Sequence, residues 1–497
     1  MVLLIFLYLI FILVYNFVSL IKEKAMKTLL RNDWANDVKK AINDFLLTYK
    51  NDSNLNKDYV VFDFDNTCSI FDSEETTLKH QLNVMAFPNN PISIKELLTT
   101  NLKNFENEFV SKKYGKVIIS DWVDDICVAF NVLNDKYGPF DVKGLSKAKQ
   151  KIVHKDIYWI EFVSKIWTLY KVLVDVIDSK IAYVWLTCWF SNFTQTDLYN
   201  LAYDAFKTYS KVNTFEITYQ TSEKIDSKVG VVTTTFRYGI SVSKNIIELM
   251  SCLKSANIDI YVCSASTNMV VKAAVDYFKL NKYVDGITGM SLKIKDGKYI
   301  NEYDITNTGY LEKKNNEFII KSIKTNAIAH GSGKVKVILE TFAKKYNKGP
   351  IAAFMDATGD FNFATEFSNL KLVVCFNSAK KSITEGGGFI STLAIYQKEA
   401  LKYALKKANK NNDTLYVLQG RDENKKRVLI NSNSSVIFKS NAYRLFANND
   451  SYKLLNIFIE NSYNCKQIID TYCIKGHDEK YNLSYGFLKQ YDGYHSK

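Results

Sequence analysis

The chain has 497 residues, and this length alone suggests about two to four domains. Hydrophobic residues make up 47% of it and aromatic residues 14%, a composition that supports a large core and excludes a disordered protein. The net charge of +13 is spread along the chain without a basic block, so we interpret it as a solvated surface and expect no nucleic-acid partner.

The first 24 residues differ from the rest of the chain. Residues 1–21 contain no charged side chain, and about 20 apolar residues are enough to span a bilayer as a helix. A signal peptide usually has basic residues before its apolar region, whereas here Lys22, Lys24 and Lys27 follow it. We expect residues 1–24 to be a transmembrane anchor or an export signal, which contacts the membrane through residues 1–21. The protein would be membrane-anchored or exported (periplasmic or extracellular), and the side of the membrane is left open.

Apolar runs alternate with helical patterns along much of the remaining chain. Residues 25–58 predict a helical segment whose apolar face carries Trp34, Val38, Ile42 and Phe45. Strands are expected at residues 59–65, 258–264, 350–356 and 370–376, with helices before two of them at 244–256 and 334–346. Strands that alternate with helices predict an α/β fold with a parallel sheet. β-Hairpins are expected at 287–303 and at 415–430.

About 200 residues separate Thr67 from Ser264, too many for a loop. Most of them have helical and aromatic patterns, so they should form an inserted domain. We expect core segments at 25–73 and 241–385, the inserted domain at 74–240, and a C-terminal extension packed on the core at 386–497. In the extension, Cys465 and Cys473 are candidates for a disulfide if that segment lies outside the cell, and the pairing is left open.

Polar side chains end three of the expected strands. Asp63 and Asp65 end the first, Ser264 ends the second, and Asp356 ends the third, with Asp360 four residues later. Ligands of an open parallel sheet bind at the carboxyl ends of its strands, so these side chains should lie close together. Paired carboxylates can hold a hard cation, or one can act as nucleophile while the other works as acid and base.

A glycine-rich turn precedes the third of these strands. Gly331-Ser-Gly-Lys334 is expected to open a helix, whose free N–H groups suit an anion, and Lys334 adds a full positive charge. The turn is not a nucleotide-binding P-loop, because Ile328 replaces the first required glycine and Val335 replaces the hydroxyl residue. Lys336 remains an alternative for the role of Lys334.

These four motifs resemble, in order, those of the haloacid dehalogenase (HAD) superfamily in its phosphatase form. They read DFDNT at 63–67, CSAS at 263–266, GSGK at 331–334 and MDATGD at 355–360. The resemblance implies a HAD-type Rossmann-like parallel sheet with a large, mainly helical cap inserted between the first and second motifs. It also implies a Mg²⁺-dependent phosphoric monoester hydrolase. Met355 departs from the pattern, since the family usually has glycine there, and its side chain should point away from the metal.

The resemblance implies a role for each motif residue. Asp63 would attack phosphorus and become an aspartyl-phosphate, while Asp65 would protonate the leaving oxygen and then activate water. Thr67 would help to hold the turn. Ser264 and Lys334 would bind the transferring phosphoryl group. Mg²⁺ would be held by Asp63, the backbone carbonyl of Asp65, Asp356 and Asp360.

Aromatic side chains of the inserted domain bear on the substrate. Five of the 6 tryptophans lie there, and Glu74 and Glu75 stand where the chain enters it. Aromatic faces together with a carboxylate would suit a quaternary ammonium group. The alternative is that these tryptophans are simply the core of the inserted domain.

Three segments resemble the bacterial phosphorylcholine phosphatase group. They are VVFDFDNT with the following Glu74-Glu75, residues 284–304, and LQGRDEN at 418–424. This resemblance implies a small phosphorylated, phosphocholine-like metabolite as substrate, with Glu75 as a contact for its cation beside the phosphate contacts Ser264 and Lys334. Phosphoserine or another small phosphate ester is an alternative substrate. A non-catalytic, membrane-associated phosphate-ester binding protein is an alternative function.

Overall fold

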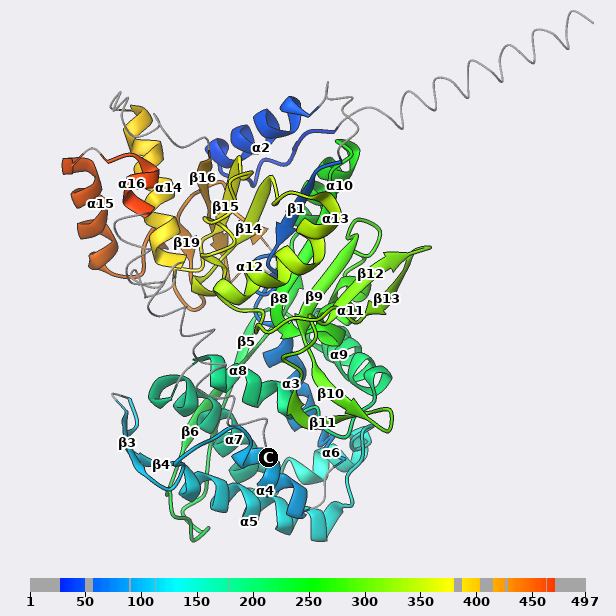
Figure 1. Cartoon of the computed structure of the whole chain (residues 1–497). Coiled ribbons are helices and arrows are strands. Elements are labelled where there is room, and N and C mark those ends of the chain that lie inside the picture. Colours follow the sequence, from blue (N-terminus) through cyan, green and yellow to red (C-terminus); the bar gives the residue numbers. More distant parts are fainter. Residues whose placement is uncertain are drawn as a thin grey trace, which may run out of the picture.

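An eight-stranded sheet organises the described part of the chain (Figure 1). In spatial order its strands are β13 (Glu317–Lys321), β12 (Tyr310–Lys314), β9 (Gly286–Met290), β8 (Asp259–Thr267), β1 (Tyr59–Phe62), β14 (Ala352–Met355), β15 (Leu372–Phe376) and β16 (Leu415–Gln419). The six strands from β9 to β16 run parallel, while β12 is antiparallel to both β9 and β13. The computed structural model describes residues 27–49, 57–88, 91–111, 113–177, 179–379, 387–402, 414–424, 428–461 and 463–469.

Strand β1 lies at the centre of this sheet and is buried on both faces. Its Tyr-Val-Val-Phe run is apolar throughout, as a strand covered on both sides requires. Alternate residues enter two different cores: Val60 and Phe62 pack on one face of the sheet, Tyr59 and Val61 on the other. The four predicted strands are confirmed, and they are four consecutive strands of the parallel region, in the order β8-β1-β14-β15.

Helices cover both faces of the sheet. One face packs against α2 (Asn36–Thr48), α10 (Lys244–Ser255) and α11 (Asn268–Tyr277). The other face packs against α12 (Ser332–Ile338) with its continuation through a π-helical turn (Leu339–Ala343) into α13 (Lys344–Tyr346), and against α14 (Gly387–Lys402), α15 (Asn449–Asn461) and α16 (Cys465–Ile469). Val38, Ile42 and Phe45 of α2 are buried together, which confirms the predicted apolar face there. Trp34 joins the same core from just before the helix begins.

A large insertion follows β1 and forms the lower half of Figure 1. The chain leaves the core through β2 (Ser69–Ile70) and returns through β7 (Ser241–Val242), and these two strands pair antiparallel. The residues between them, 71–240, are called the cap below. Its helices are α3 (Ser73–Val84), α4 (Pro91–Thr99), α5 (Ile119–Tyr137), α6 (Lys147–Val153), α7 (Ile157–Val176), α8 (Ser179–Cys188) and α9 (Gln195–Tyr209). Two antiparallel hairpins complete it: β3 (Glu108–Ser111) with β4 (Gly115–Ile118), and β5 (Phe215–Gln220) with β6 (Thr233–Tyr238).

The hairpin expected at 287–303 is present with different bounds. Its arms are β10 (Leu292–Lys295) and β11 (Lys298–Tyr303), joined at the predicted turn, whereas Gly286–Met290 belongs to the main sheet as β9. The hairpin reaches the cap, because the backbone N–H of Asn192 donates to the carbonyl of Tyr299 and the N–H of Tyr299 donates to Phe193, each at 2.8 Å. The β10/β11 hairpin, which follows β9, therefore packs against the cap.

The hairpin expected at 415–430 is present only in part, because Val428–Leu429 pairs antiparallel with Arg421–Asp422 and not with the expected first arm. Leu415–Gln419 is β16, which pairs in parallel with β15 as the edge strand of the main sheet. The chain then enters a small sheet in the order β18-β17-β19-β20, formed by β17 (Arg421–Asp422), β18 (Val428–Leu429), β19 (Ser435–Val436) and β20 (Tyr443–Arg444). The apolar run Leu415–Leu418 suits a hairpin arm or a parallel strand equally, and here it pairs with the open edge of β15.

The architecture confirms the predicted fold class, an α/β fold with a Rossmann-like, mainly parallel sheet and a large, mainly helical cap inserted between the first and second motifs. Within the described residues, no helix combines the length and apolar character needed to cross a membrane. The anchor or signal predicted at 1–24 lies outside those residues, as does Cys473. Its suggested partner Cys465 is described and carries a free, buried thiol.

Candidate active site

Three buried carboxylates meet at the carboxyl ends of the central strands. Asp63 follows β1, Asp356 follows β14, and Asp360 ends the 3₁₀ turn Thr358–Asp360. Each offers an oxygen within 4.8 Å of those of the other two. All are at most 5% exposed. The parallel pairing of β1 with β14 brings these acids together although about 290 residues separate them in the chain.

Lys334 lies between two of these carboxylates. Its Nζ donates to Asp63 Oδ1 at 2.7 Å and to Asp360 Oδ1 at 2.5 Å, and the side chain is 2% exposed. Burial alone would lower the pKa of Lys334, but the charges of Asp360 and Asp63 outweigh it and raise that pKa above its usual value. The alternative Lys336 instead faces Glu340 at 3.8 Å. Of the two lysines, the structure brings Lys334 to the acids.

The predicted glycine-rich turn holds Lys334 through a close backbone approach. Helix α12 begins at Ser332, as expected. The N–H of Gly331 donates to the carbonyl of Gly359 at 2.8 Å, which ties the lysine turn to the acidic turn. A Cβ at position 333 would lie 1.8 Å from the carbonyl oxygen of Ile328, so only glycine fits there.

The acids outnumber the cations in this cluster. Burial and the neighbouring charge of Asp360 raise the pKa of Asp63 well above its usual value, with Lys334 opposing them. One lysine among three carboxylates leaves surplus negative charge, which is costly in a buried site without a further cation. The donors are all carboxylate oxygens, the ligand type that Mg²⁺ takes in proteins. The residues present therefore fit the predicted magnesium ion.

Asp65 lies beside this cluster and is held by three donors. The N–H of Ser73 donates to Oδ1 at 2.6 Å, while Ser264 Oγ and Ser266 Oγ donate to Oδ2 at 3.2 Å and 2.6 Å. The two serines come from β8, so the predicted Ser264 does reach the first motif. Ser266 is an additional contact that was not singled out in the sequence, although it is the last residue of the quoted CSAS motif.

The turn that carries Asp65 is closed by backbone groups. The N–H groups of Thr67, Cys68 and Ser69 all donate to the carbonyl of Phe64. Thr67 is 4% exposed, and its hydroxyl has no hydrogen-bond partner among the described residues. Met355 is fully buried in the apolar core on one face of the sheet, in line with the expectation that its side chain points away from the acids.

Glu75 is paired with cations of the chain itself. Lys171 Nζ lies 2.8 Å from its Oε1 and Lys79 Nζ lies 3.4 Å from its Oε2. Burial would raise the pKa of Glu75, but the two lysines, Lys171 foremost, lower it to about 2. Both ammonium groups also lie over the ring of Trp167, at 4.7 Å and 4.6 Å. The carboxylate and the aromatic face expected to bind a choline-like cation are thus already occupied by lysines.

The five cap tryptophans form part of the cap's core. They are between 0% and 6% exposed and belong to one apolar cluster, consisting of Trp122, Trp159, Trp167, Trp185 and Trp189. This observation favours the simpler of the two interpretations of the aromatic pattern. Trp167 is distinguished from the others by its two lysine contacts.

Glu74, the neighbour of Glu75, bridges the cap and the core. Its carboxylate accepts hydrogen bonds from the Thr267 N–H at 3.0 Å, the Thr267 hydroxyl at 2.7 Å and the Thr187 hydroxyl at 3.1 Å. Burial is the largest influence and raises its pKa to about 7. The sequence places Glu74 at the entry to the cap but does not indicate this role, because both of its partners lie more than 100 residues away.

A second contact between cap and core lies next to the lysine turn. The rings of Tyr183 on α8 and His330 are 5.5 Å apart. His330 is half-buried and directly precedes Gly331. Two cap helices therefore contact core segments near the acid cluster. Helix α8 contacts the lysine turn through Tyr183, and α3 contacts the end of β8 through Glu74.

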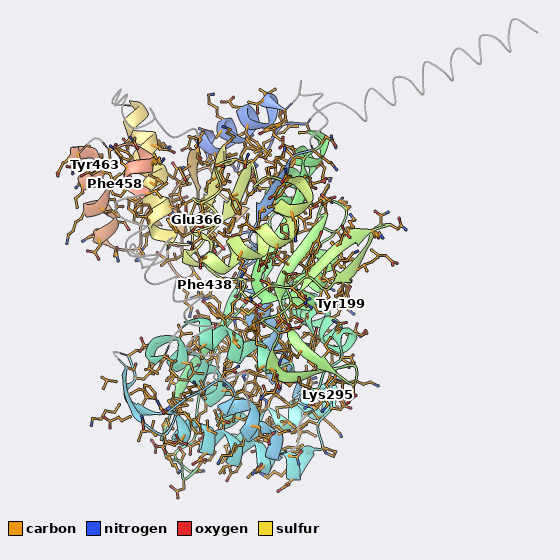
Figure 2. All side chains as sticks on the ribbon, in the orientation of Figure 1. Tyr199, Lys295, Glu366, Phe438, Phe458 and Tyr463 are labelled. Carbon is orange, nitrogen blue, oxygen red and sulfur yellow. The ribbon has the colours of Figure 1, made fainter. Side chains whose placement is uncertain are left out.

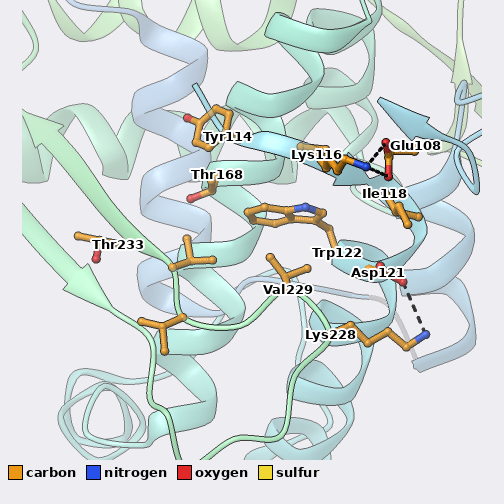
Figure 3. A pocket seen from close by; sticks show the side chains of 13 residues that line it. Glu108, Tyr114, Lys116, Ile118, Asp121, Trp122, Thr168, Lys228, Val229 and Thr233 are labelled. Carbon is orange, nitrogen blue, oxygen red and sulfur yellow. Dashed lines mark hydrogen bonds and ion pairs between the residues drawn. The ribbon is translucent and has the colours of Figure 1, made fainter. Parts of the chain in front are cut away.

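A separate pocket of about 370 Å³ lies within the cap (Figure 3). It is bounded by the β3/β4 hairpin, the start of α5, Thr168 of α7 and the segment 228–233, with the Trp122 ring along one wall. Its described lining includes none of the acids at the strand ends. Lys228 and Asp121 face each other across its rim at 3.9 Å.

Comparisons with known proteins support the fold. No protein-family model and no curated protein matches the chain. A functionally unknown protein from Anaerococcus prevotii DSM 20548 has a similar structure, with a TM-score of 0.65 and 23% identity over 83% of this chain and 100% of that one. At that identity the likeness establishes a shared fold and no activity.

Two further solved structures match less well. One is a protein of unknown function from Bordetella pertussis Tohama I, with a TM-score of 0.33 and 9% identity over 70% of this chain and 96% of that one. The other is cytosolic 5'-nucleotidase IIIB bound to cytidine, with a TM-score of 0.31 and 11% identity over 70% and 82%. These scores are too low to bear on function, which has to be argued from the site.

Proposed function

We propose that the protein is a Mg²⁺-dependent phosphomonoesterase that acts through an aspartyl-phosphate on Asp63. The observation that carries the proposal is the buried cluster of Asp63, Lys334, Asp356 and Asp360 at the carboxyl ends of parallel strands, with Asp65 beside it. Catalysis of phosphoryl transfer rests mainly on positioning and charge stabilisation, and this cluster supplies both.

In the first step a carboxylate oxygen of Asp63 attacks phosphorus and the bond from phosphorus to the ester oxygen breaks. Asp65 donates a proton to the departing oxygen, which leaves as an alcohol. The three donors on Asp65 fix its carboxyl group in one orientation. Lys334 would neutralise charge shared by Asp63 and the phosphoryl oxygens. Ser264, whose Oγ lies 3.2 Å from Asp65 Oδ2, would hydrogen-bond a phosphoryl oxygen.

In the second step Asp65, now ionised, accepts a proton from water. The oxygen of that water attacks phosphorus, the bond between phosphorus and Asp63 breaks, and inorganic phosphate leaves. Asp63, Asp356, Asp360 and the backbone carbonyl of Asp65 would hold Mg²⁺, which when bound neutralises phosphoryl charge during both steps. The side chain of Met355 is buried in the apolar core and is not one of these ligands.

The leaving group is a separate question. The resemblance to phosphorylcholine phosphatases favours a quaternary ammonium ester, whereas the pairing of Glu75 with Lys79 and Lys171 favours an anionic or zwitterionic leaving group such as that of phosphoserine. Competition of phosphocholine against phosphoserine in one assay decides between them through their ratio of kcat/KM. A preference for phosphocholine would require Lys171 to move away from Glu75 when substrate binds.

The activity is tested with purified protein, p-nitrophenyl phosphate and Mg²⁺. We expect turnover that Asp63→Asn lowers by more than about 10³-fold, as expected for loss of a nucleophile. Asp44→Asn, which changes an exposed acid in α2, is the matched control and should leave kcat unchanged. Binding of phosphate esters without any turnover would instead support the non-catalytic binding protein.

We also propose that residues 1–24 anchor the protein in a membrane or direct its export. This proposal is supported by the sequence alone. Fractionation of cells that express the full chain tests it, with a variant lacking residues 1–24 as the control. Recovery of both chains in the same soluble fraction would contradict it.

A further inference from the structure

The motif LQGRDEN at 418–424 has no part in the proposed chemistry, yet it contacts the turn that carries Asp65, called the catalytic turn below. Arg421 Nη1 donates to the carbonyl oxygen of Asn66 at 2.8 Å, and Nη2 donates to Asn66 Oδ1 at 3.3 Å. Asn66 stands between Asp65 and Thr67. The contact joins residues 355 positions apart in the chain.

The arginine is held in place by its own surroundings. Nε and Nη2 of Arg421 donate to Glu423 Oε1 at 3.2 Å and 2.8 Å, and both side chains are buried, at 3% and 7% exposure. Gly420 makes the approach feasible, because a Cβ there would lie 2.1 Å from the carbonyl oxygen of Ser434. Because the Arg421 guanidinium is planar, buried and paired, its N–H donors are held in fixed positions, which is not the case in an exposed ion pair.

The residue that Arg421 contacts has an unfavourable backbone conformation. Asn66 has a φ of 63°, in the left-handed region, which asparagine tolerates better than most residues but which is still less stable than the right-handed one. Two hydrogen bonds from a buried guanidinium stabilise this conformation. Because Asp65 directly precedes Asn66, the direction of its carboxyl group depends on the same turn.

Glu423 extends the connection to the cap. Its Oε2 lies 3.8 Å from Nη1 of Arg237 on β6, and Arg237 also donates to Glu216 at 2.9 Å. The Arg237 guanidinium lies 4.9 Å from the centre of the Phe438 ring, which Figure 2 places where the sheet region and the cap meet. The small C-terminal sheet therefore touches the catalytic turn and the cap together.

We propose that Arg421 is a positioning residue that holds the turn at Asn66 in the conformation the reaction needs, and that Glu423 couples this turn to the cap through Arg237. The inference rests on the proposed phosphatase function. Arg421 does not touch the reacting atoms; it acts through the orientation of Asp65. Its loss should therefore slow the chemical step and leave substrate affinity nearly unchanged.

The test compares Arg421→Ala and Arg421→Lys with wild-type full-length protein on p-nitrophenyl phosphate. Misplacement of a catalytic group by a distant substitution lowers rates by about 10²-fold, so we expect a kcat loss of roughly that size for Arg421→Ala, with KM little changed. Lysine retains the charge but not the fork, so Arg421→Lys should recover only part of the rate. Free guanidinium at sub-denaturing concentration should restore most of the kcat of Arg421→Ala.

Arg31→Ala is the matched control, since Arg31 makes a similar forked contact with Asp33 at the protein surface. It should keep wild-type kcat and show no response to guanidinium. Wild-type kcat in Arg421→Ala, or a rate loss that guanidinium does not restore, would overturn the inference. If Arg421→Ala does not fold, Arg421→Lys decides: its failure to fold as well assigns the residue to stability alone and overturns the inference.

The outcomes separate this inference from the function on which it rests. If the wild-type protein shows no turnover, both the phosphatase proposal and this inference are refuted. Active wild-type protein that is indifferent to Arg421 refutes only the inference. Glu423→Gln and Arg237→Gln add a test of the coupling. We expect a smaller loss of kcat in Glu423→Gln than in Arg421→Ala, and a loss in Arg237→Gln that is smaller again. Arg237→Gln removes only the contact between the cap and the C-terminal sheet, whereas Glu423→Gln also weakens the pairing with Arg421.

Discussion

Two buried lysines of this protein make nearly the same contacts in different places. In the core, Lys334 lies between Asp63 and Asp360. In the cap, Lys165 is fully buried and contacts Asp125 at 2.8 Å as well as Glu161 one helical turn away. A buried lysine between two carboxylates is therefore no sign of an active site by itself.

The two clusters differ in what else the carboxylates bind. Asp125 also accepts the backbone N–H groups of Lys228 and Val229, each at 3.0 Å, and Lys165 donates to the hydroxyl of Ser227. The cap cluster thus fastens the segment 227–229 to α5 and α7. The core cluster adds a third carboxylate, Asp356, and lies at the ends of the parallel strands. Surplus acid at that location is what indicates a cation and an anionic substrate.

The largest expected effect concerns the cap cluster. Lys165→Met leaves two buried carboxylates without their cation, which should lower the free energy of unfolding by about 3–5 kcal/mol. Urea denaturation followed by circular dichroism measures the change. The folded variant should keep wild-type kcat. Lost activity at unchanged stability would mean that the cap lysine belongs to the site and that the comparison is wrong.

The matching substitution in the core should affect catalysis first. Lys334→Met removes the charge beside Asp63 and should lower kcat by about 10²–10³-fold, the usual result of losing one group that stabilises the transition state. Steady-state kinetics on p-nitrophenyl phosphate measure it. Lys336→Met, two residues along the same helix, is the control and should stay within about threefold of wild type. A larger loss in Lys336→Met than in Lys334→Met would reverse the assignment.

Magnesium should distinguish the clusters through stability. A ligand that binds the folded state stabilises it by about 2.7 kcal/mol at 100 times its Kd, so Mg²⁺ should raise the thermal midpoint when ionic strength is kept constant with NaCl. Asp356→Asn should abolish this shift, and Asp125→Asn should retain it. An identical Mg²⁺ response in both variants would place the ion elsewhere. This measurement needs no turnover.

The smallest effect is expected at Glu74, between cap and core. Burial raises its pKa to about 7, from 4.5 for an unperturbed glutamate. Between these pH values the folded protein keeps a proton that the unfolded chain has released, so the free energy of unfolding falls as pH rises and levels off above about pH 7. Glu74→Gln cannot ionise and should gain about 1–3 kcal/mol relative to wild type between pH 4.5 and 8. A difference that does not vary with pH would contradict this.

The sequence predicted those parts of the fold and site that depend on local patterns. Buried central strands need uninterrupted apolar runs, and the acids Asp63 and Asp356 directly follow such runs, so their meeting could be inferred from the rule that parallel strands end at one edge. The turn around Lys334 could be predicted because its glycines and the following apolar pattern lie within a few residues.

The remaining features depend on contacts between distant residues. Leu415–Gln419 was expected to form a hairpin, but the open edge of β15 binds it as a parallel strand. The partners of Glu74 lie 113 and 193 positions away, and Asn66, the distant partner of Arg421, lies 355 positions away. Neither glutamate nor arginine carries a local signal that selects such a partner. The pairing of Glu75 had one such signal: Lys79 follows it by one helical turn on α3, a spacing that favours an ion pair.

The central position of β1 also governs how the protein is made. Its two neighbours, β8 and β14, are translated about 200 and 290 residues later, which at roughly 5–20 residues per second leaves one edge of β1 open for about 15–60 s. The cap is contiguous and can fold during that interval, whereas β1, an apolar strand with both edges unpaired, cannot. The strand that directly precedes Asp63 is therefore a segment that needs protection by a chaperone during synthesis.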